Sequence, residues 1–318
     1  ASAIEECGTM RVIRGRRNIT ESDQGCVVTI GNFDGVHLGH QAILAAVKSQ
    51  ATKDSVDSML VCFEPQPKEF FDEFKAPARL TRFAEKVECL SQHGVDRILC
   101  MKFNEATRSM SGEAFVRFVV DELVPKAVFV GDDFRFGADR SGGFDALKRA
   151  GNQHGFLVSD FGTITEGAQR VSSTRIRACL SEGRFEEAKA LLGRPYTISG
   201  RIVYGKQIGR TLGVPTANIQ LHRYTAPLSG VYAVRGSLGG EQFDGVANVG
   251  VRPTVEDGAL KPILEVHFFG LDREVYGAKA VIEFVAKVRD EKKFESLDAL
   301  KIAISEDVSR VKSLFDHR

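Results

Sequence analysis

The sequence predicts an α/β protein in two parts, a doubly wound parallel sheet followed by a small antiparallel β-barrel with a terminal helix. In the first 190 residues, short continuous apolar runs alternate with amphipathic helical patterns. This alternation is typical of a parallel sheet that helices cover on both faces. After Gly193 the pattern changes to alternating strands with Gly-rich turns and one helical stretch at the end, which indicates a small barrel.

The strands and helices of the first part follow from these patterns in chain order. Parallel strands joined by right-handed crossovers form a doubly wound sheet. The ligand crevice of such a sheet lies at the carboxyl ends of the strands, where the strand order reverses. We therefore expect the loop after the first strand to face a ligand. The predicted strands are 26–30, 59–63, 97–103, 127–131 and 156–161, and the predicted helices are 41–50, 82–93, 112–123 and 143–154.

The second part begins where a helical stretch, 184–192, ends in Gly193 and Pro195. Glycine commonly ends a helix, and a proline shortly after it cannot continue one. We place a boundary there and predict one domain at 10–193 and a second at 194–318. Residues 1–9 read as an irregular start outside the fold. The predicted strands of the second domain are 196–204, 230–238, 241–248, 263–269 and 281–288, and its helix is 297–315.

Composition argues for a cytoplasmic protein that acts on small molecules. The six cysteines are scattered and form no CxxC pair, unlike a disulfide framework or a zinc site. No apolar run reaches the ~20 residues of a membrane span, and a formal net charge of +1 gives no general attraction to nucleic acid. We expect no membrane or nucleic-acid partner, and a monomer or transient homo-oligomer. A short basic run near the start reads as a solvated edge: Arg11, Arg14, Arg16 and Arg17.

The loop after the first predicted strand, GNFDGVHLGH (31–40), carries the first candidate site. A first strand-to-helix loop presents backbone N–H groups and a helix N-terminus to an anion, and Gly31, Gly35 and Gly39 let a phosphate approach closely. His37 and His40 are suited to donate hydrogen bonds to its oxygens, with added charge when protonated. The alternative is a simple turn with solvated histidines, but two histidines between a strand and a helix favour the phosphate site.

A second segment, RVSSTRIR (170–177), begins a predicted helix with hydroxyl and guanidinium groups at its positive end. Ser173 and Thr174 are suited to cap the helix and to donate to phosphates, and Arg177 to clamp two phosphate oxygens. Taken alone, this would be an ordinary helix start with surface arginines. Together with the histidine loop it resembles the HxGH and SSTxIR signatures of the nucleotidyltransferase superfamily.

The resemblance extends to one family, the bacterial bifunctional riboflavin kinase/FMN adenylyltransferases, or FAD synthetases. FEPQPKEFF (63–71), RLT (79–81) and VGDDFRFG (130–137) are similar to segments of that family. The resemblance implies that the first domain transfers the adenylyl group of ATP to FMN, with His37, His40 and Arg177 as catalytic residues. The implied ATP and phosphate contacts are Gly31, Asn32, Phe33, Gly35, Gly39, Ser173 and Thr174, and the implied flavin contacts are Phe63, Pro65, Asp133 and Phe136.

The chemistry of this step agrees with the residue types present. The nucleophile would be the FMN phosphate, which is largely a dianion at neutral pH because its second pKa is about 6. No general base is required. The site must instead stabilise charge on the ATP triphosphate and the departing pyrophosphate, through the histidines, Arg177, backbone N–H groups and Mg²⁺.

The second candidate site lies in YGKQIGRTLGVPTANI (204–219). The sequence contains no GxxxxGKS/T pattern, so a kinase here would not be a P-loop enzyme. Read by itself, a Gly/Pro segment with a Thr and an Asn is more often a turn, but PTAN resembles the hallmark of riboflavin kinases. Glycines and basic residues suit a loop that covers phosphates, and hydroxyl and amide oxygens suit Mg²⁺. The expected phosphate contacts are Gly205, Lys206, Gly209 and Arg210, and the expected Mg²⁺ ligands are Thr216 and Asn218.

Three further segments resemble the riboflavin kinase pattern: GVANVGVRPT (245–254), KPILEVHFF (261–269) and DREVYG (272–277). By this resemblance Glu265 would be the catalytic base. The 5′-hydroxyl of riboflavin is a poor nucleophile, so a carboxylate must accept its proton during phosphoryl transfer. In a strand with alternating faces, Glu265 shares a face with His267. VRDEKKF (288–294) resembles the segment that covers the flavin, with Arg289 and Glu291 as candidate contacts.

The sequence therefore predicts an enzyme that phosphorylates riboflavin to FMN in its second domain and adenylylates FMN to FAD in its first. One alternative is an HxGH transferase with another phosphorylated acceptor, but this does not explain PTAN and Glu265. Another is a flavin-sensing protein that has lost catalysis. The presence of His37, His40, Thr216 and Asn218 argues against it.

Overall fold

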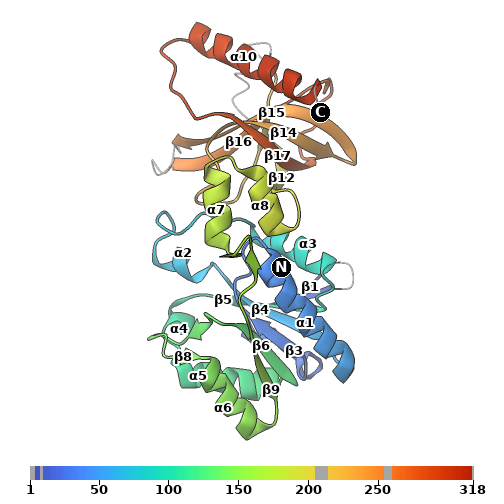
Figure 1. The fold of residues 1–318 in the computed structure, drawn as a ribbon, viewed down its shortest axis with the longest axis vertical. Helices are drawn as coiled ribbons and strands as arrows, with labels where there is room; N and C mark the ends of the chain where they lie inside the picture. The colour runs from blue at the N-terminus through green and yellow to red at the C-terminus, as the bar shows by residue number, and fades with distance from the viewer. Residues whose placement is uncertain (1–3, 8–9, 205–213, 254–259, 317–318) are drawn as a thin grey trace. The chain divides into compact units, whose positions relative to one another are not determined.

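The computed structural model describes residues 4–7, 10–204, 214–253 and 260–316. The chain separates into two compact units (Figure 1). The first unit comprises Ala1–Pro77 and Phe83–Ser172, and the second comprises Ala78–Arg82 and Ser173–Arg318. None of the helices described is long and apolar enough to cross a membrane.

The first unit is built on a seven-stranded sheet in the order β1-β2-β5-β4-β3-β6-β9. Six of these strands are parallel, and β1 pairs antiparallel with β2 at one edge. The predicted doubly wound parallel sheet is confirmed. The strands are β1 (Ile4–Cys7), β2 (Met10–Arg14), β3 (Val27–Ile30), β4 (Ser58–Glu64), β5 (Arg97–Lys102), β6 (Ala127–Gly131) and β9 (Leu157–Phe161).

Helices connect these strands, and the predicted helix at 112–123 is an α-helix that continues as a π-helical turn. Its C-terminal part is η3 (Phe118–Leu123). The other helices are η1 (Arg16–Asn18), η2 (Glu21–Asp23), α1 (Leu38–Asp54), α2 (Pro67–Phe71), α3 (Phe83–Gln92), α4 (Glu105–Arg108), α5 (Gly112–Arg117) and α6 (Phe144–His154). Two small hairpins are β7 (Arg135–Phe136) with β8 (Gly142–Gly143), and β10 (Thr165–Glu166) with β11 (Gln169–Arg170).

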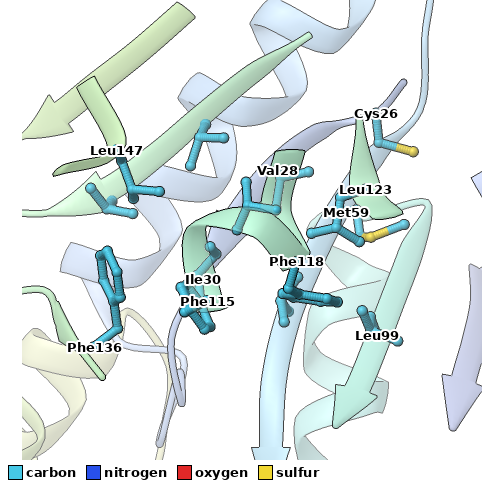
Figure 2. Packing of buried hydrophobic residues seen from close by; sticks show 14 of the residues in the cluster. Cys26, Val28, Ile30, Met59, Leu99, Phe115, Phe118, Leu123, Phe136 and Leu147 are labelled. Atoms are coloured by element: carbon cyan, nitrogen blue, oxygen red, sulfur yellow. The ribbon is translucent and has the colours of Figure 1, made fainter. Parts of the chain in front are cut away.

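Both faces of the sheet are buried, which explains the continuous apolar runs. On one face Val28 and Met59 pack with Phe115, Phe118 and Leu147 from α5, η3 and α6 (Figure 2). On the other face, alternate strand residues pack against α1 and α3. Each fully buried side chain of this size contributes about 1.5–3 kcal/mol to folding.

The sequence prediction missed the strands β1 and β2. The basic run was predicted to be a solvated edge, yet β2 pairs with β5, and Met10, Val12 and Ile13 in it are buried. Arg14, Arg16 and Arg17 are exposed, as predicted, and Arg11 is half-buried. The two arginines in MRVIR made this segment read as charged, although its other three residues are apolar. The segment Ile4–Cys7, which the prediction excluded as an irregular start, pairs with this strand.

The strand order explains where the histidine loop lies. The strands β4 and β6, which follow β3 in the chain, pair with it on opposite sides. The order reverses at β3, so the loop after it lies at the topological switch point, where open α/β sheets bind ligands.

The second unit contains a closed barrel in the order β12-β13-β16-β15-β14-β17, with every pair antiparallel. The predicted barrel and terminal helix are confirmed. The strands are β12 (Thr197–Val203), β13 (Ala217–Ile219), β14 (Gly230–Leu238), β15 (Glu241–Pro253), β16 (Leu260–Phe268) and β17 (Lys279–Arg289), and the helices are α7 (Ser173–Ser181), α8 (Phe185–Leu192) and α10 (Leu297–Asp316). The short strand β13 was not predicted.

Helices α7 and α8 pack within this second unit. Phe185 at the start of α8 contacts Tyr232 and Phe284 of the barrel, with ring centroids 5.8 and 6.3 Å away. This packing assigns α7 and α8 to the barrel unit, although they precede Gly193. The assignment of 10–193 and 194–318 to separate activities stays a prediction.

Candidate active sites

The loop between β3 and α1 has an unusual backbone. Phe33 has a φ of 48°, Gly35 of 84° and Val36 of 42°. Phe33 and the β-branched Val36 rarely adopt this left-handed region, and each such residue costs roughly 1–3 kcal/mol. Both are buried, at 3% and 0% exposed, so packing holds them in place. Strained, well-packed loops of this kind concentrate at functional sites.

The two histidines of the loop lie directly against each other. Their ring centroids are 3.6 Å apart at an interplanar angle of 15°. His37 also caps α1, because its Nδ1 accepts a hydrogen bond from the backbone N–H of His40 at 3.3 Å. An imidazole whose Nδ1 accepts carries its proton on Nε2 when neutral. His37 therefore has an Nε2–H to donate.

His40 lies between two rings, since Phe33 stacks on it with a centroid distance of 4.5 Å and His37 stacks on it as well. Burial, with smaller contributions from His37 and the charge of Lys86, holds the pKa of His40 well below its usual value. His40 is therefore neutral at neutral pH. The expectation that protonation adds charge to this pair does not hold for His40, which can act as a neutral donor.

Several polar atoms around this loop lack hydrogen-bond partners among the described residues: Asn32 Oδ1, His40 Nδ1 and Lys86 Nζ. Buried polar groups are normally satisfied, so unsatisfied ones call for an explanation such as a ligand. Gly39 keeps the loop compact, because a Cβ there would lie 3.2 Å from the His37 ring. Asn32 and Gly39 were both predicted to contact ATP.

The SSTxIR segment begins at the last residue of the first unit, Ser172, and the rest of it lies in the second unit. Ser173 and Thr174 begin α7, as predicted for a helix start. Arg177 donates through Nε to the carbonyl of Ala78 at 2.6 Å. The HxGH segment and the predicted contacts Ser173, Thr174 and Arg177 belong to different compact units, and their joint action on one ATP stays a prediction.

The predicted flavin contacts of the first unit fall into different environments. Phe63 is the last residue but one of β4, two positions before Pro65, and meets Phe103 edge to face, with centroids 6.0 Å apart. Phe103 also contacts Phe71, whose side chain is 64% exposed and was not predicted as a site residue. The available signal was its place in FEPQPKEFF. A sequence does not specify, however, whether a Phe on a five-residue helix is buried or exposed.

Asp133 and Phe136 are both engaged by protein groups. Asp133 forms an ion pair with Arg170 at 2.9 Å. Phe136 is only 7% exposed and packs in the hydrophobic core against Phe115, with centroids 4.7 Å apart. Little of the Phe136 ring is therefore left for a flavin, and both predicted contacts stay predictions.

The barrel brings three polar residues into one row. Glu265 on β16 pairs with Asn218 on β13 and with Asn248 on β15, and directly paired residues of antiparallel strands point to the same face. All three are half-buried, whereas the neighbouring Leu264 and Val266 are buried inside. The row joins the predicted base to a predicted Mg²⁺ ligand and adds Asn248, which the prediction missed. The sequence feature that could have identified Asn248 is its place in GVANVGVRPT, at a strand position that faces outward.

His267 connects β16 to the PTAN segment. Its Nδ1 lies 2.8 Å from the carbonyl oxygen of Pro215, and since a carbonyl only accepts, Nδ1 carries the proton. The next residue, Thr216, lines a cavity of about 260 Å³ with Ile202 and Tyr276, among others. The hydrogen bond fixes the chain immediately before both predicted Mg²⁺ ligands.

Glu291 and Arg289 have different surroundings. Glu291 lies over Gly250, where an added Cβ would be 2.4 Å from its Oε1. Gly250 is two residues from Asn248, so Glu291 is close to the polar row. Arg289 forms a bidentate ion pair with Asp307 of α10, at 2.8–3.1 Å. Its guanidinium thus anchors α10 to the barrel, and its flavin contact stays a prediction.

Four predicted phosphate contacts, Gly205, Lys206, Gly209 and Arg210, lie outside the described residues. Within the described part of the chain, no cluster of three or more His, Cys, Asp or Glu side chains is suited to a metal ion. Thr216 and Asn218 provide the hard oxygen donors that suit Mg²⁺, an ion that commonly binds through one or two protein ligands and the phosphates of its nucleotide.

Comparison with known proteins identifies both halves of the chain. The FAD synthetase family model matches residues 19–175 and the riboflavin kinase model matches residues 192–315. A bifunctional riboflavin kinase/FMN adenylyltransferase of Pseudomonas fluorescens is 47% identical over 96% of this chain and 98% of its own length. The corresponding enzyme of Escherichia coli strain K12 is 43% identical, also over 96% and 98%.

A solved structure has the same overall fold. It is described as a macrolide-efflux protein from Streptococcus pneumoniae, is 28% identical, and matches with a TM-score of 0.75 over 93% of this chain and 97% of its own. The efflux activity in that description is said of the Streptococcus protein alone. The names of the two relatives above agree with the activities that the motifs of both sites predict. On this similarity along nearly the whole length, the chain belongs to the family of bacterial bifunctional riboflavin kinase/FMN adenylyltransferases.

Proposed function

We propose that this chain makes FAD from riboflavin in two ATP-dependent steps. The barrel would transfer the γ-phosphoryl group of ATP to riboflavin, giving FMN and ADP. The parallel-sheet domain would transfer the adenylyl group of a second ATP to FMN, giving FAD and pyrophosphate. The observation that carries the proposal is the coexistence of a carboxylate flanked by two amides in the barrel with a strained histidine loop at a switch point.

In the phosphorylation step, Glu265 would accept the proton of the riboflavin 5′-hydroxyl as the oxygen attacks the γ-phosphorus. A positioned general base typically contributes 10²–10⁴-fold. Asn218 and Asn248, on either side of Glu265, would orient the carboxylate and the substrates. Glu291, which lies over Gly250, is near enough to this row to contact the flavin. Arg289, Gly205, Lys206, Gly209 and Arg210 complete the proposed contacts.

Thr216 and Asn218 would hold Mg²⁺ together with the ATP phosphates. When bound, this ion neutralises charge that develops on the phosphate oxygens. His267 supports the arrangement because its hydrogen bond to the Pro215 carbonyl links the strand of the base to the segment of the Mg²⁺ ligands.

In the adenylylation step, a phosphate oxygen of FMN would attack the α-phosphorus of ATP, and pyrophosphate would leave. His37 and His40 would donate hydrogen bonds to the triphosphate as neutral imidazoles, together with Asn32, the backbone N–H groups of the loop, Ser173, Thr174 and Arg177. Preorganised donors of this kind are worth about 10²–10³-fold each. The flavin would contact Phe63 and Pro65 beside the exposed Phe71, with Asp133 and Phe136 nearby.

We further propose a cytoplasmic enzyme that works as a monomer or transient homo-oligomer. Five cysteines are buried thiols in this structure, which agrees with a reducing compartment. They are Cys26, Cys62, Cys89, Cys100 and Cys179.

One assay tests both steps. The full-length protein is incubated with riboflavin, ATP and Mg²⁺, and riboflavin, FMN and FAD are separated chromatographically. We expect FMN to appear first and FAD to follow. Absence of FMN would refute the kinase step, and FMN that never becomes FAD would refute adenylylation. A flavin-sensing protein without catalysis would bind riboflavin and convert none of it.

A further inference from the structure

A lysine of α3 is buried without an evident structural purpose. The Lys86 side chain is 0% exposed, and its Nζ has no hydrogen-bond partner among the described residues. Its ion-pair partner, Glu64, lies 3.7 Å away at Oε1, which is too far for a hydrogen bond. A buried ammonium group with so weak a partner is costly. A leucine or methionine would fill the same space more favourably.

Lys86 is directed toward the phosphate loop by its position on α3. Cys89 and Leu90, three and four residues further along, share its face of the helix, and both pack in one cluster with Phe33 and Val36 of the loop. Glu64 is the last residue of β4, the strand next to β3. The lysine therefore lies at the carboxyl end of β4.

The charge of Lys86 reaches the histidine pair. It lowers the pKa of His40, after burial and the neighbouring His37 ring. The other ionisable side chain of the loop, Asp34, is also buried. The negative charge of Glu64 partly offsets the positive charge of Lys86. A fixed cation at this place belongs to the site rather than to the hydrophobic core.

We propose that Lys86 is a positioning residue for adenylyl transfer, acting through His40 and Glu64 to supply the buried positive charge of this site. The inference rests on the adenylylation activity proposed above. A protonated His37 could no longer accept the His40 N–H through Nδ1, and two charged rings 3.6 Å apart would repel each other. Lys86 opposes protonation of His40, so the two stacked rings do not both become charged and His40 stays a neutral donor. Its own charge favours the triphosphate.

The test compares Lys86→Met, which removes the charge and keeps the volume, with Lys86→Arg, which keeps the charge. In Lys86→Met we expect a higher His40 pKa by NMR titration. FAD synthesis from FMN should fall about tenfold, less than the loss of a direct donor, and its acid limb should move to higher pH. Lys86→Arg should restore the low His40 pKa. Phosphorylation of riboflavin by the same molecule should not change.

Two more variants make the outcome unambiguous. Glu64→Gln removes the offsetting negative charge, so the His40 pKa should fall further, opposite in sign to Lys86→Met. Lys48→Met, which breaks an ion pair with Asp96 at 2.7 Å in the same unit, should alter neither His40 nor FAD synthesis. An unchanged His40 pKa in both Lys86→Met and Glu64→Gln would overturn the proposal. Failure of the unmodified protein to make FAD would instead refute the adenylylation activity, while the titration would still measure the coupling.

Discussion

The two sites differ in how they treat protons. The loop after β3 stacks the buried His37 on the half-buried His40 and keeps His40 neutral, and its one carboxylate, Asp34, is buried and has no base role in the proposed chemistry. The barrel row places the half-buried Glu265 between two amides on the outer face of three strands. The first site therefore offers hydrogen-bond donors, and the second offers an acceptor.

The difference follows from the two nucleophiles. A phosphate dianion attacks without losing a proton, so its site has only to stabilise the charge of ATP and pyrophosphate. A primary hydroxyl must lose its proton as it attacks, so its site needs a base within reach. One chain that uses ATP twice thus shows that the nucleophile, rather than the nucleotide, decides which side chains a phosphoryl or adenylyl transfer site requires.

The largest expected effect comes from removing the acceptor. Glu265→Gln should lower the rate of riboflavin phosphorylation by about 10²–10⁴-fold, because an amide cannot take the proton. FAD synthesis from added FMN should be unchanged. Both rates can be followed chromatographically in one preparation.

The matched control is Glu283→Gln, on barrel strand β17, which is also half-buried. It should leave both activities intact. Equal loss in both variants, or loss of adenylylation in Glu265→Gln, would contradict the assignment of the base.

Removing the donors should have the next largest effect. His37→Ala combined with His40→Ala should lower FAD synthesis by at least about 10²–10³-fold and leave phosphorylation unchanged. Because His37 also caps α1, the variant should lose roughly 1 kcal/mol of stability, which urea unfolding can measure. His154→Ala, at the end of α6, is the control. A pH profile of FAD synthesis that required protonated His40 would contradict the neutral-donor mechanism.

Much of this comparison could be predicted from the sequence, because local patterns set it. Apolar runs and helical periodicity predict the sheet and its switch point, and the alternation of β16 places Glu265 and His267 on one face. The histidine loop is identified by three glycines and two histidines in ten residues.

The rest depends on contacts between distant segments. Asn248 joins Glu265 only through the register of β15 against β16, which no local pattern specifies. Lys86 reaches the histidine loop only because α3 packs against it. The sequence of β2 contains two arginines, which hide its strand character. Its apolar side chains are buried because β2 pairs with β5. Arg289 looked available for a flavin, yet Asp307 of α10 holds it.

A third prediction concerns an ion pair that stabilises the first unit but not the second. Burial alone would raise the pKa of Asp23, but hydrogen bonds from Thr20 and the guanidinium groups of Arg97 and Arg11 outweigh it and lower the pKa. A depressed carboxyl pKa stabilises the fold above the unfolded value of about 3.9, and this stabilisation is lost as the pH falls through the folded pKa. Asp23→Asn should cost about 3 kcal/mol at neutral pH.

This loss should appear in one activity first. On heating, adenylylation by Asp23→Asn should be inactivated at a lower temperature than phosphorylation, because Asp23 lies in the first unit. The stability difference from the unmodified protein, measured by urea unfolding, should shrink as the pH drops below about 4. Asp244→Asn, which breaks an exposed pair with Arg235 at 3.4 Å, should show neither effect. A difference that grew toward acid pH would contradict the ion-pair explanation.

The smallest expected effect tests how the barrel site is held together. In His267→Asn the side-chain amide can replace Nδ1 as donor to the Pro215 carbonyl, whereas in His267→Gln the amide lies one bond further out, nearer the position of Nε2. We expect Asn to retain riboflavin phosphorylation, and Gln and Ala to lose about fivefold to tenfold, which corresponds to one hydrogen bond of about 1 kcal/mol. The loss should appear mainly in the KM for MgATP, since the bond fixes the segment of Thr216 and Asn218. If Asn and Gln behaved alike, the imidazole would matter for its shape, and the link between the base strand and the metal ligands would have to lie elsewhere.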